Sequence, residues 1–326
     1  MLLVPFLILG MSRKLQGDGL DNPGLNFLSQ DFIPGAVARG GAYSTYFDEP
    51  ASIYYNPAAS VWVPKAKVAF TFSHSFLPDA VYLQHLTLFI KPKTIPFYFS
   101  IVHFTSDVMA LGKNSDENGE LNARTLMFSF NTGNKIGKDV SWGVTTKFIT
   151  SRYFTTSRNY LAVDGGLSID LPKANIRGFA GVRNLGFDLT VIQNLLSLAP
   201  SSANINATNV VQTPVGLPLT IALGFQYQLF KIFQFYADVD YSIIESIMGQ
   251  GLLAIRPKIG ISFTPIPEIS VNVGRTFRNN AALGYFTFGV DLNFKFDKLP
   301  IGFQYAFEPI PDFSFNHYLG ITFKFI

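Results

Sequence analysis

The chain has 326 residues, of which 48% are hydrophobic and only 14% are charged, whereas a soluble globular domain carries about 25% charged residues. This composition argues against water as the only solvent. The formal net charge of +3 argues against a nucleic-acid partner, which requires clustered Lys and Arg, and the absence of cysteine excludes disulfides, thiolate nucleophiles, Cys metal sites and a lipid-modified N-terminal cysteine.

No segment is apolar for long enough to form a transmembrane helix. Such a helix needs about 20 apolar residues, and even the apolar start, Met1 to Met11, is followed at once by Ser12, Arg13 and Lys14. Without such helices, only a closed β-barrel pairs every backbone group inside a bilayer. The 33 Phe and 14 Tyr fit a barrel, since aromatic residues favour strands and gather at membrane interfaces. The composition therefore predicts an all-β transmembrane barrel.

Residues 1–18 are interpreted as a signal peptide that is removed from the folded protein. Leu2 to Gly10 resembles the apolar core of such a peptide, but the basic stretch that should precede it is missing. Either the true start lies upstream, which we favour, or the signal is a weak one.

Residues 19–64 are predicted to form a unit of their own before the first strand. From Ala36 to Ala59 they read AVARGGAYSTYFDEPASIYYNPAA, which neither alternates nor follows a helical period. Gly40 and Gly41 allow positive φ and close backbone approach, and the Asn-Pro step after Tyr55 favours a turn. Two alternatives follow: a periplasmic turn that leads into the first strand, or a hatch that folds inside the lumen.

Residues 65–326 are predicted to form the barrel wall, because they divide into segments of about ten residues with two-residue alternation. In Leu219 to Leu229, the odd positions are apolar and the even positions are small or polar. Fourteen antiparallel strands are expected at residues 65–76, 81–91, 96–105, 122–131, 140–151, 158–170, 176–185, 218–230, 232–243, 252–264, 267–278, 281–296, 299–308 and 312–326. A barrel of about eight strands is already just filled by its lining side chains. A wider one therefore needs a plug unless its pore is open, and residues 19–64 would supply enough chain for one.

The connections between these strands predict which end faces the cell surface. With both termini periplasmic, the periplasmic connections are all short, among them Thr132 to Asp139 and a tight turn at Pro265 and Ile266. The other set contains two long loops, residues 106–121 and 186–217. Short periplasmic turns and long extracellular loops are typical of outer-membrane barrels.

The second long loop carries an apolar stripe at roughly helical spacing. Its residues include Leu189, Ile192, Leu195 and Leu196. An exposed apolar patch at the extracellular end could capture a hydrophobic molecule. The alternative is a lid that packs on neighbouring loops or rests in the lipid interface, and the sequence does not separate the two.

Charged residues of both signs are predicted to face the lumen, where a general porin would show a bias of one sign. We expect them to form internal pairs that brace the wall and the plug; the alternative is a polar contact with the head group of a ligand. They are Lys147, Asp164, Asp238, Asp240, Arg256, Lys258, Asp291 and Lys295.

No pattern in the sequence predicts catalysis, a metal or a cofactor. The histidines His74, His85, His103 and His317 are dispersed, and neither an HExxH nor a GxSxG motif is present. His74 lies beside Ser73 and Ser75, but adjacent strand residues face opposite sides of a sheet. We therefore expect a protein that is not an enzyme.

The segment before the first strand carries a resemblance to a known family. A Gly-Gly-Ala step, an acidic residue and then Asn-Pro-Ala resemble the N-terminal motif of the FadL-type long-chain fatty acid transporters and of the related PorV and PorQ family. The Tyr pair before the Asn, and the stretches GVTTKFI, GVRNLG and LPLTIALGFQY, resemble the PorV-like and spirochaetal branch. The motif residues are Gly40, Gly41, Ala42, Asp48, Asn56, Pro57 and Ala58.

This resemblance implies a barrel in the bacterial outer membrane, surrounded by its lipid, with residues 19–64 as a hatch. It further implies uptake of long-chain fatty acids or other hydrophobic compounds as the function. The alternative implied by the same branch is a PorV-like protein that binds secreted or surface proteins as a secretion-associated shuttle.

The end of the chain resembles the C-terminal signal that the bacterial barrel-assembly machinery reads. Gly320, Phe323 and Phe325 follow that pattern, with Ile326 as one extra trailing residue. The assembly machinery is therefore an expected partner. The plainer alternative is a last strand with no such role.

Overall fold

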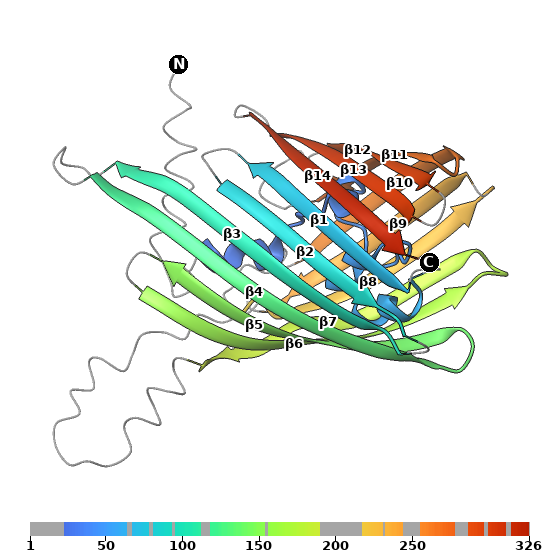
Figure 1. Ribbon diagram of the computed structural model, residues 1–326, viewed down its shortest axis with the longest axis horizontal. Coiled ribbons are helices and arrows are strands. Elements are labelled where there is room, and N and C mark those ends of the chain that lie inside the picture. Colours follow the sequence, from blue (N-terminus) through green and yellow to red (C-terminus); the bar gives the residue numbers. More distant parts are fainter. Residues whose placement is uncertain are drawn as a thin grey trace, which may run out of the picture.

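The computed structural model is a closed barrel of fourteen antiparallel strands (Figure 1). It describes residues 23–63, 67–77, 81–92, 95–111, 118–153, 156–189, 217–230, 232–243, 255–277, 286–296, 299–310 and 314–325. The strands are β1 (Val68–Leu77), β2 (Val81–Ile90), β3 (Phe97–Leu111), β4 (Asn118–Ile136), β5 (Val140–Tyr153), β6 (Thr156–Leu171), β7 (Ile176–Asp188), β8 (Thr220–Leu229), β9 (Phe233–Ser242), β10 (Ile255–Ile266), β11 (Ile269–Thr276), β12 (Phe286–Phe296), β13 (Leu299–Ile310) and β14 (Ser314–Phe325). The predicted fold class and strand number are confirmed.

The barrel closes where the first strand pairs with the last. β1 and β14 run antiparallel in an unbroken register from Val68–Phe325 to Phe76–His317. Because every strand has a neighbour on both sides, the wall has no free edge, and its backbone groups are paired as a bilayer requires. Among the described residues, no helix is long and apolar enough to cross a membrane.

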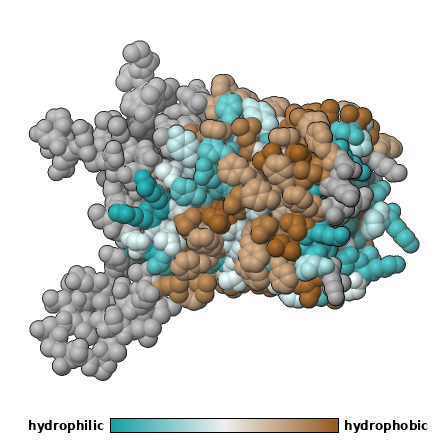
Figure 2. All heavy atoms as spheres, viewed as in Figure 1, coloured by the Kyte–Doolittle hydropathy of each residue, from teal (hydrophilic) through white to brown (hydrophobic). Residues whose placement is uncertain are grey.

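The two faces of the wall differ in polarity as the alternation predicts. On β8, the outward-facing Leu223 and Phe225 are 54% and 47% exposed, whereas the inward-facing Gln226 is 4% exposed. On β12, Phe288 is 45% exposed and Asp291 is buried. Figure 2 shows hydrophobic residues gathered in a belt over the middle of the wall, with hydrophilic residues towards one end. This belt fits the hydrocarbon layer of an outer membrane.

Replacement of Leu223 or Phe288 by Asp is expected to impair assembly, whereas Asp at Gln226 or Asn293 is expected to be tolerated. A charge on the lipid face at the bilayer midplane costs about 2–4 kcal/mol for Lys or Arg and somewhat less for Asp. The measurement is the yield of folded, heat-modifiable protein in membranes. Equal yields of all four variants would contradict the assignment of the two faces.

The structure corrects two of the predicted connections. The predicted loop 106–121 is mostly strand, because β3 continues to Leu111 and pairs with β4 from Asn118 onwards. Outside the bilayer, paired strands still satisfy their backbone hydrogen bonds, but their side chains no longer need to alternate between apolar and polar. The alternation in the sequence therefore ends before the strands do. The turn after β10 lies at Pro267 and Glu268, after a register shift between Phe263 and Ile266.

The wall has a further irregularity between β6 and β7. Their register shifts between Val163 and Gly165, and Asn184 on β7 adopts a φ of 60°. The backbone N–H of Asn184 donates to the Asp164 carboxylate at 2.7 Å. This carboxylate therefore holds a β-bulge, a device that bends a strand and redirects its side chains.

Residues 23–63, here named the luminal segment, lie inside the barrel. They contain the 3₁₀ helix η1 (Pro23–Ser29), the helix α2 (Pro34–Ala38) and the 3₁₀ helices η2 (Pro50–Tyr54) and η3 (Pro57–Val61). Each of these begins with proline, whose fixed φ and missing N–H suit a first helical position. Figure 1 shows these helices, in blue, enclosed by the strands. Because side chains from opposite parts of the wall contact the segment, it crosses the lumen rather than covering one end.

Candidate functional site

The two motif glycines form a tight turn directly after α2. Gly40 and Gly41 have φ values of 62° and 79°, in the left-handed region that favours glycine. The Gly41 N–H donates to the Ala36 carbonyl at 2.8 Å. Two threonines of the wall form hydrogen bonds with the turn. The Thr287 hydroxyl accepts from the Gly40 N–H at 3.1 Å, and the Thr276 hydroxyl donates to the Gly40 carbonyl at 2.7 Å. A Cβ on Gly40 would lie 2.1 Å from the backbone nitrogen of Arg275, so no larger residue fits.

Substitution of Gly41 by Val is expected to give a mild ion leak, smaller than that from removal of the segment. A β-branched residue adopts positive φ only at a cost, and a Cβ here would lie 2.2 Å from the Asp31 carboxylate. The measurement is conductance in planar bilayers, with Gly137→Ala as the control, since Gly137 has a φ of 76° with nothing near its Cβ position. A Gly41→Val protein that conducts no more than that control would contradict the expected role of the turn.

Arg39 anchors the turn to the wall, and the sequence analysis did not identify it. Its side chain is 1% exposed and forms an ion pair with Asp291 of β12 at 2.6 Å. It also donates to the Ser262 hydroxyl and to the Gly35 carbonyl, both at 2.9 Å, and lies over the Tyr46 ring. The one available signal was a basic residue among small residues in the stretch AVARGG.

The Asn-Pro-Ala part of the motif is built into the segment and the wall together. Asn56 is fully buried; its side-chain carbonyl accepts from the Ala58 N–H at 2.8 Å, and its amide donates to the Ser44 carbonyl at 2.6 Å and the Ser168 hydroxyl at 2.8 Å. The Pro57 carbonyl accepts from Asn131 of β4 at 3.1 Å. Asn56 thereby begins η3 and fixes it against the wall.

The acidic member of the motif lies apart from this packing. The Asp48 side chain is 42% exposed and lies 3.8 Å from the Arg177 guanidinium, whereas Ala42 and Ala58 are fully buried. The structure thus brings six of the seven motif residues into the packed interface between segment and wall, and leaves Asp48 at its margin.

Most of the inward-facing charges are paired. Lys147 pairs with Asp164 at 2.6 Å, and Lys258 pairs with Asp31 at 3.0 Å and Asp240 at 2.9 Å. Asp240 also pairs with Arg183. Of these contacts, Lys258–Asp31 joins the wall to the luminal segment, as the Arg39–Asp291 pair also does, which agrees with the expected bracing by mixed charges.

The remaining predicted luminal charges behave differently from one another. Asp238 accepts from the backbone N–H groups of Tyr43 and Ser44 at 3.0 and 2.9 Å, so it holds the segment through backbone hydrogen bonds. Arg256 donates to the Ser29 carbonyl. Lys295 lies near the end of β12, in register with Pro300, and is exposed, so its predicted orientation towards the lumen stays a prediction.

The phenols of the segment stay neutral inside the lumen. Burial raises the pKa of Tyr54 and of Tyr55, and it raises the pKa of Tyr43 and Tyr46 in the same way. Each therefore presents an O–H group and an aromatic face, not a phenolate, at physiological pH.

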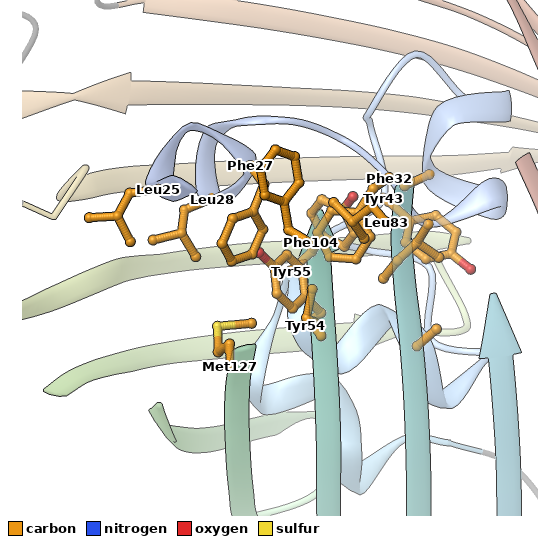
Figure 3. Packing of buried hydrophobic residues seen from close by; sticks show 14 of the residues in the cluster. Leu25, Phe27, Leu28, Phe32, Tyr43, Tyr54, Tyr55, Leu83, Phe104 and Met127 are labelled. Atoms are coloured by element: carbon orange, nitrogen blue, oxygen red, sulfur yellow. The ribbon is translucent and has the colours of Figure 1, made fainter. Parts of the chain in front are cut away.

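One side of the lumen is apolar, which is unusual for an outer-membrane barrel with a polar interior. Leu83, Val102, Phe104, Met127 and Ile149 project inward from β2–β5 and are 0–7% exposed. The luminal segment covers them with an apolar face of its own, built from Leu25, Phe27, Leu28 and Phe32 (Figure 3). Phe27 stacks on Phe104 with ring centroids 5.9 Å apart.

The predicted capture loop lies largely outside the described residues. Leu189 follows directly after β7 and is half-buried. Ile192, Leu195 and Leu196 lie outside the part of the chain that the structure describes, so the capture hypothesis stays a prediction.

Comparisons with known proteins identify the architecture. No family model matches the sequence, and no curated protein matches it. The structure resembles that of a Pseudomonas aeruginosa FadL homologue, with a TM-score of 0.59 and 10% identity over 91% of this chain and 98% of the other. It also resembles the Pseudomonas putida toluene transporter TodX, with a TM-score of 0.54 and 11% identity over 88% and 95%.

A third similar structure is the monoaromatic hydrocarbon channel CymD, with a TM-score of 0.58 and 9% identity over 91% of this chain and 98% of the other. The closed wall and its apolar belt define a bacterial outer-membrane β-barrel. Its fold is that of the FadL-type barrels, as the sequence motif implies.

Proposed function

We propose that this barrel takes up long-chain fatty acids or other hydrophobic compounds across the outer membrane. The observation that carries the proposal is the apolar inner surface of β2–β5, with Leu83, Phe104 and Met127, in a lumen whose other sides carry paired charges. A channel for ions or sugars gains nothing from such a surface, whereas an apolar compound is stabilised by it. Two of the similar structures named above are a toluene transporter and a monoaromatic hydrocarbon channel, which supports transport rather than catalysis.

The luminal segment is proposed to act as the hatch of this transporter. It fills the lumen between walls that lie on opposite sides, through Arg39 to β12 and Pro57 to β4. A compound that enters from outside must therefore pass or move it. In this proposal the loop of residues 186–217 captures the compound first.

The C-terminal strand is proposed to be recognised by the barrel-assembly machinery. Phe325 projects outward from β14 with 49% exposure, on the strand that completes the wall against β1. Exposure of this face before closure would make it available to an assembly factor.

Uptake is tested in a Gram-negative bacterial strain that lacks its own FadL-type transporters. Expression of the chain should restore uptake of radiolabelled oleate or toluene, and mass spectrometry of the purified protein should find a co-purified hydrophobic compound. A strain that expresses Phe104→Asp, with a charge on the apolar inner surface, is the matched negative control. If neither compound enters and secreted or surface proteins co-purify instead, the PorV-like alternative replaces this proposal.

A further inference from the structure

A row of hydroxyl side chains crosses three neighbouring strands on the inner face of the wall. Thr87 of β2 lies in register with Ser100 of β3, and Ser100 with Ser129 of β4. They are 1%, 3% and 6% exposed. Within the described residues, the hydroxyls of Thr87 and Ser129 have no hydrogen-bond partner. Buried hydroxyls normally have one, so this row offers hydrogen bonds that the protein itself does not use.

The imidazole of His85, two residues before Thr87 on β2, also has a hydrogen-bonding atom that the protein does not use. The Nε2 atom of His85 lies 3.2 Å from the Tyr98 hydroxyl, but its Nδ1 atom has no partner among the described residues. Ser73, in register with His85 on β1, also has a buried hydroxyl without a partner in the described structure. The unused donors and acceptors therefore form one continuous area on β1–β4.

This polar area directly adjoins the apolar inner surface. His85 lies in register with Val102, Val102 with Met127, and Met127 with Ile149. Leu83 and Phe104 form the next pair along the same strands. A molecule lying along β2–β4 would thus contact apolar side chains at one end and hydroxyl groups at the other.

The charges near this surface do not favour an anion. Lys147 is the basic residue in register with Ser129, and its ammonium group lies 2.6 Å from the Asp164 carboxylate and donates to Asn184 at 2.9 Å. A carboxylate placed here would meet a cation that is already neutralised, together with the charge of Asp164. An uncharged polar group meets no such penalty.

We propose that the inner surface of β2–β4 binds an uncharged hydrophobic compound that carries a hydroxyl group, such as an alkylphenol or a long-chain alcohol. The apolar part contacts Phe104 and Met127, and the hydroxyl group is held by Thr87 and Ser129. This inference rests on the proposed uptake of hydrophobic compounds and narrows its substrate class from fatty acid anions to neutral molecules.

In the closed barrel, the luminal segment covers both halves of this surface. On the polar half, Phe32 and Tyr54 pack edge-on against His85, with ring centroids 5.6 and 5.9 Å away. Phe27 stacks on Phe104, and Leu25 and Leu28 belong to the same cluster. The compound takes the place of these side chains, so segment and ligand compete for one surface. Phe27→Ala should therefore tighten ligand binding severalfold, and weaker binding in this variant would overturn the competition.

The experiment measures binding of three matched probes to the purified full-length barrel at pH 7. They are 4-butylphenol, butylbenzene and 4-butylbenzoate, which share an apolar part and differ in having a hydroxyl group, no polar group or a charge. The phenol is expected to bind most tightly and the benzoate most weakly. Tighter binding of the benzoate than of the phenol would overturn the proposal.

Paired variants separate the proposal from the general function. Thr87→Val with Ser129→Ala should weaken binding of 4-butylphenol roughly tenfold and leave butylbenzene unchanged. Ser242→Ala is the matched control, because its hydroxyl is also buried without a partner in the described residues but lies on β9. An unchanged affinity for the phenol in the double variant would overturn the proposal that Thr87 and Ser129 bind the hydroxyl group of the ligand. If butylbenzene fails to bind even to the unaltered barrel, the proposed uptake function is overturned instead.

Discussion

Deletion of residues 31–60 is expected to leave a folded barrel that conducts ions at least roughly tenfold better than the full chain, since so wide a barrel is not filled by its own lining. The wall should survive because its stability comes from closed strand pairing, and pairing of β1 with β14 involves none of the deleted residues. Lys258 would keep Asp240 as its partner, and Asp291, which loses Arg39, would face a water-filled lumen, where an unpaired charge is tolerated.

Two measurements check this deletion together. Heat-modifiable migration in gels reports that the wall is folded, and single-channel recording in planar bilayers reports conductance. A barrel with residues 31–60 replaced by a Gly-Ser stretch of equal length separates specific packing from the mere presence of chain. Unchanged conductance in the deletion would mean that something else closes the lumen, and the proposed hatch would lose its main support.

Replacement of Arg39 by Met is expected to release the α2 turn from the wall. The change leaves the Asp291 carboxylate buried without its cation, and breaking a buried pair costs about 3–5 kcal/mol. The natural chain has no cysteine, so a single Cys introduced at the fully buried Ala42 reports opening of the segment. The labelling rate of that Cys by a maleimide should rise roughly a hundredfold or more in the Arg39→Met background, because the same free-energy cost increases the population of the open segment.

The double variant Arg39→Met with Asp291→Leu is the informative companion. It removes both charges, so no buried charge is left unpaired, and labelling should return towards the rate of the Ala42→Cys protein alone. Equal labelling rates with and without Arg39 would show that the turn does not depend on this ion pair.

Much of the wall could be predicted because its two environments leave a direct pattern in the sequence. Lipid on one side and lumen on the other impose a two-residue alternation, which assigned Leu223 and Phe288 outward and Asp291 inward. The pattern fails where the environments end. Beyond the bilayer, β3 and β4 continue as paired strands to Leu111 and from Asn118 without needing that alternation.

The interior of the site could be predicted only in outline. Gly40, Gly41 and Asn56 were identifiable because a positive φ and an Asn-Pro step have local signatures. Arg39 was not, because its significance depends on Asp291, which lies 252 positions away in the sequence. The hydroxyl row was equally hidden, since Thr87, Ser100 and Ser129 become neighbours only through the register of three strands.

The contacts between the luminal segment and the late strands β11 and β12 also set an order of events during biogenesis. Arg39 and Gly40 belong to the first part of the chain to be made, yet their wall partners Thr276, Thr287 and Asp291 lie near its end. These contacts cannot form until nearly all strands exist, and contacts so distant in sequence form slowly. The luminal segment is therefore fixed in place only as the last strands complete the cylinder around it.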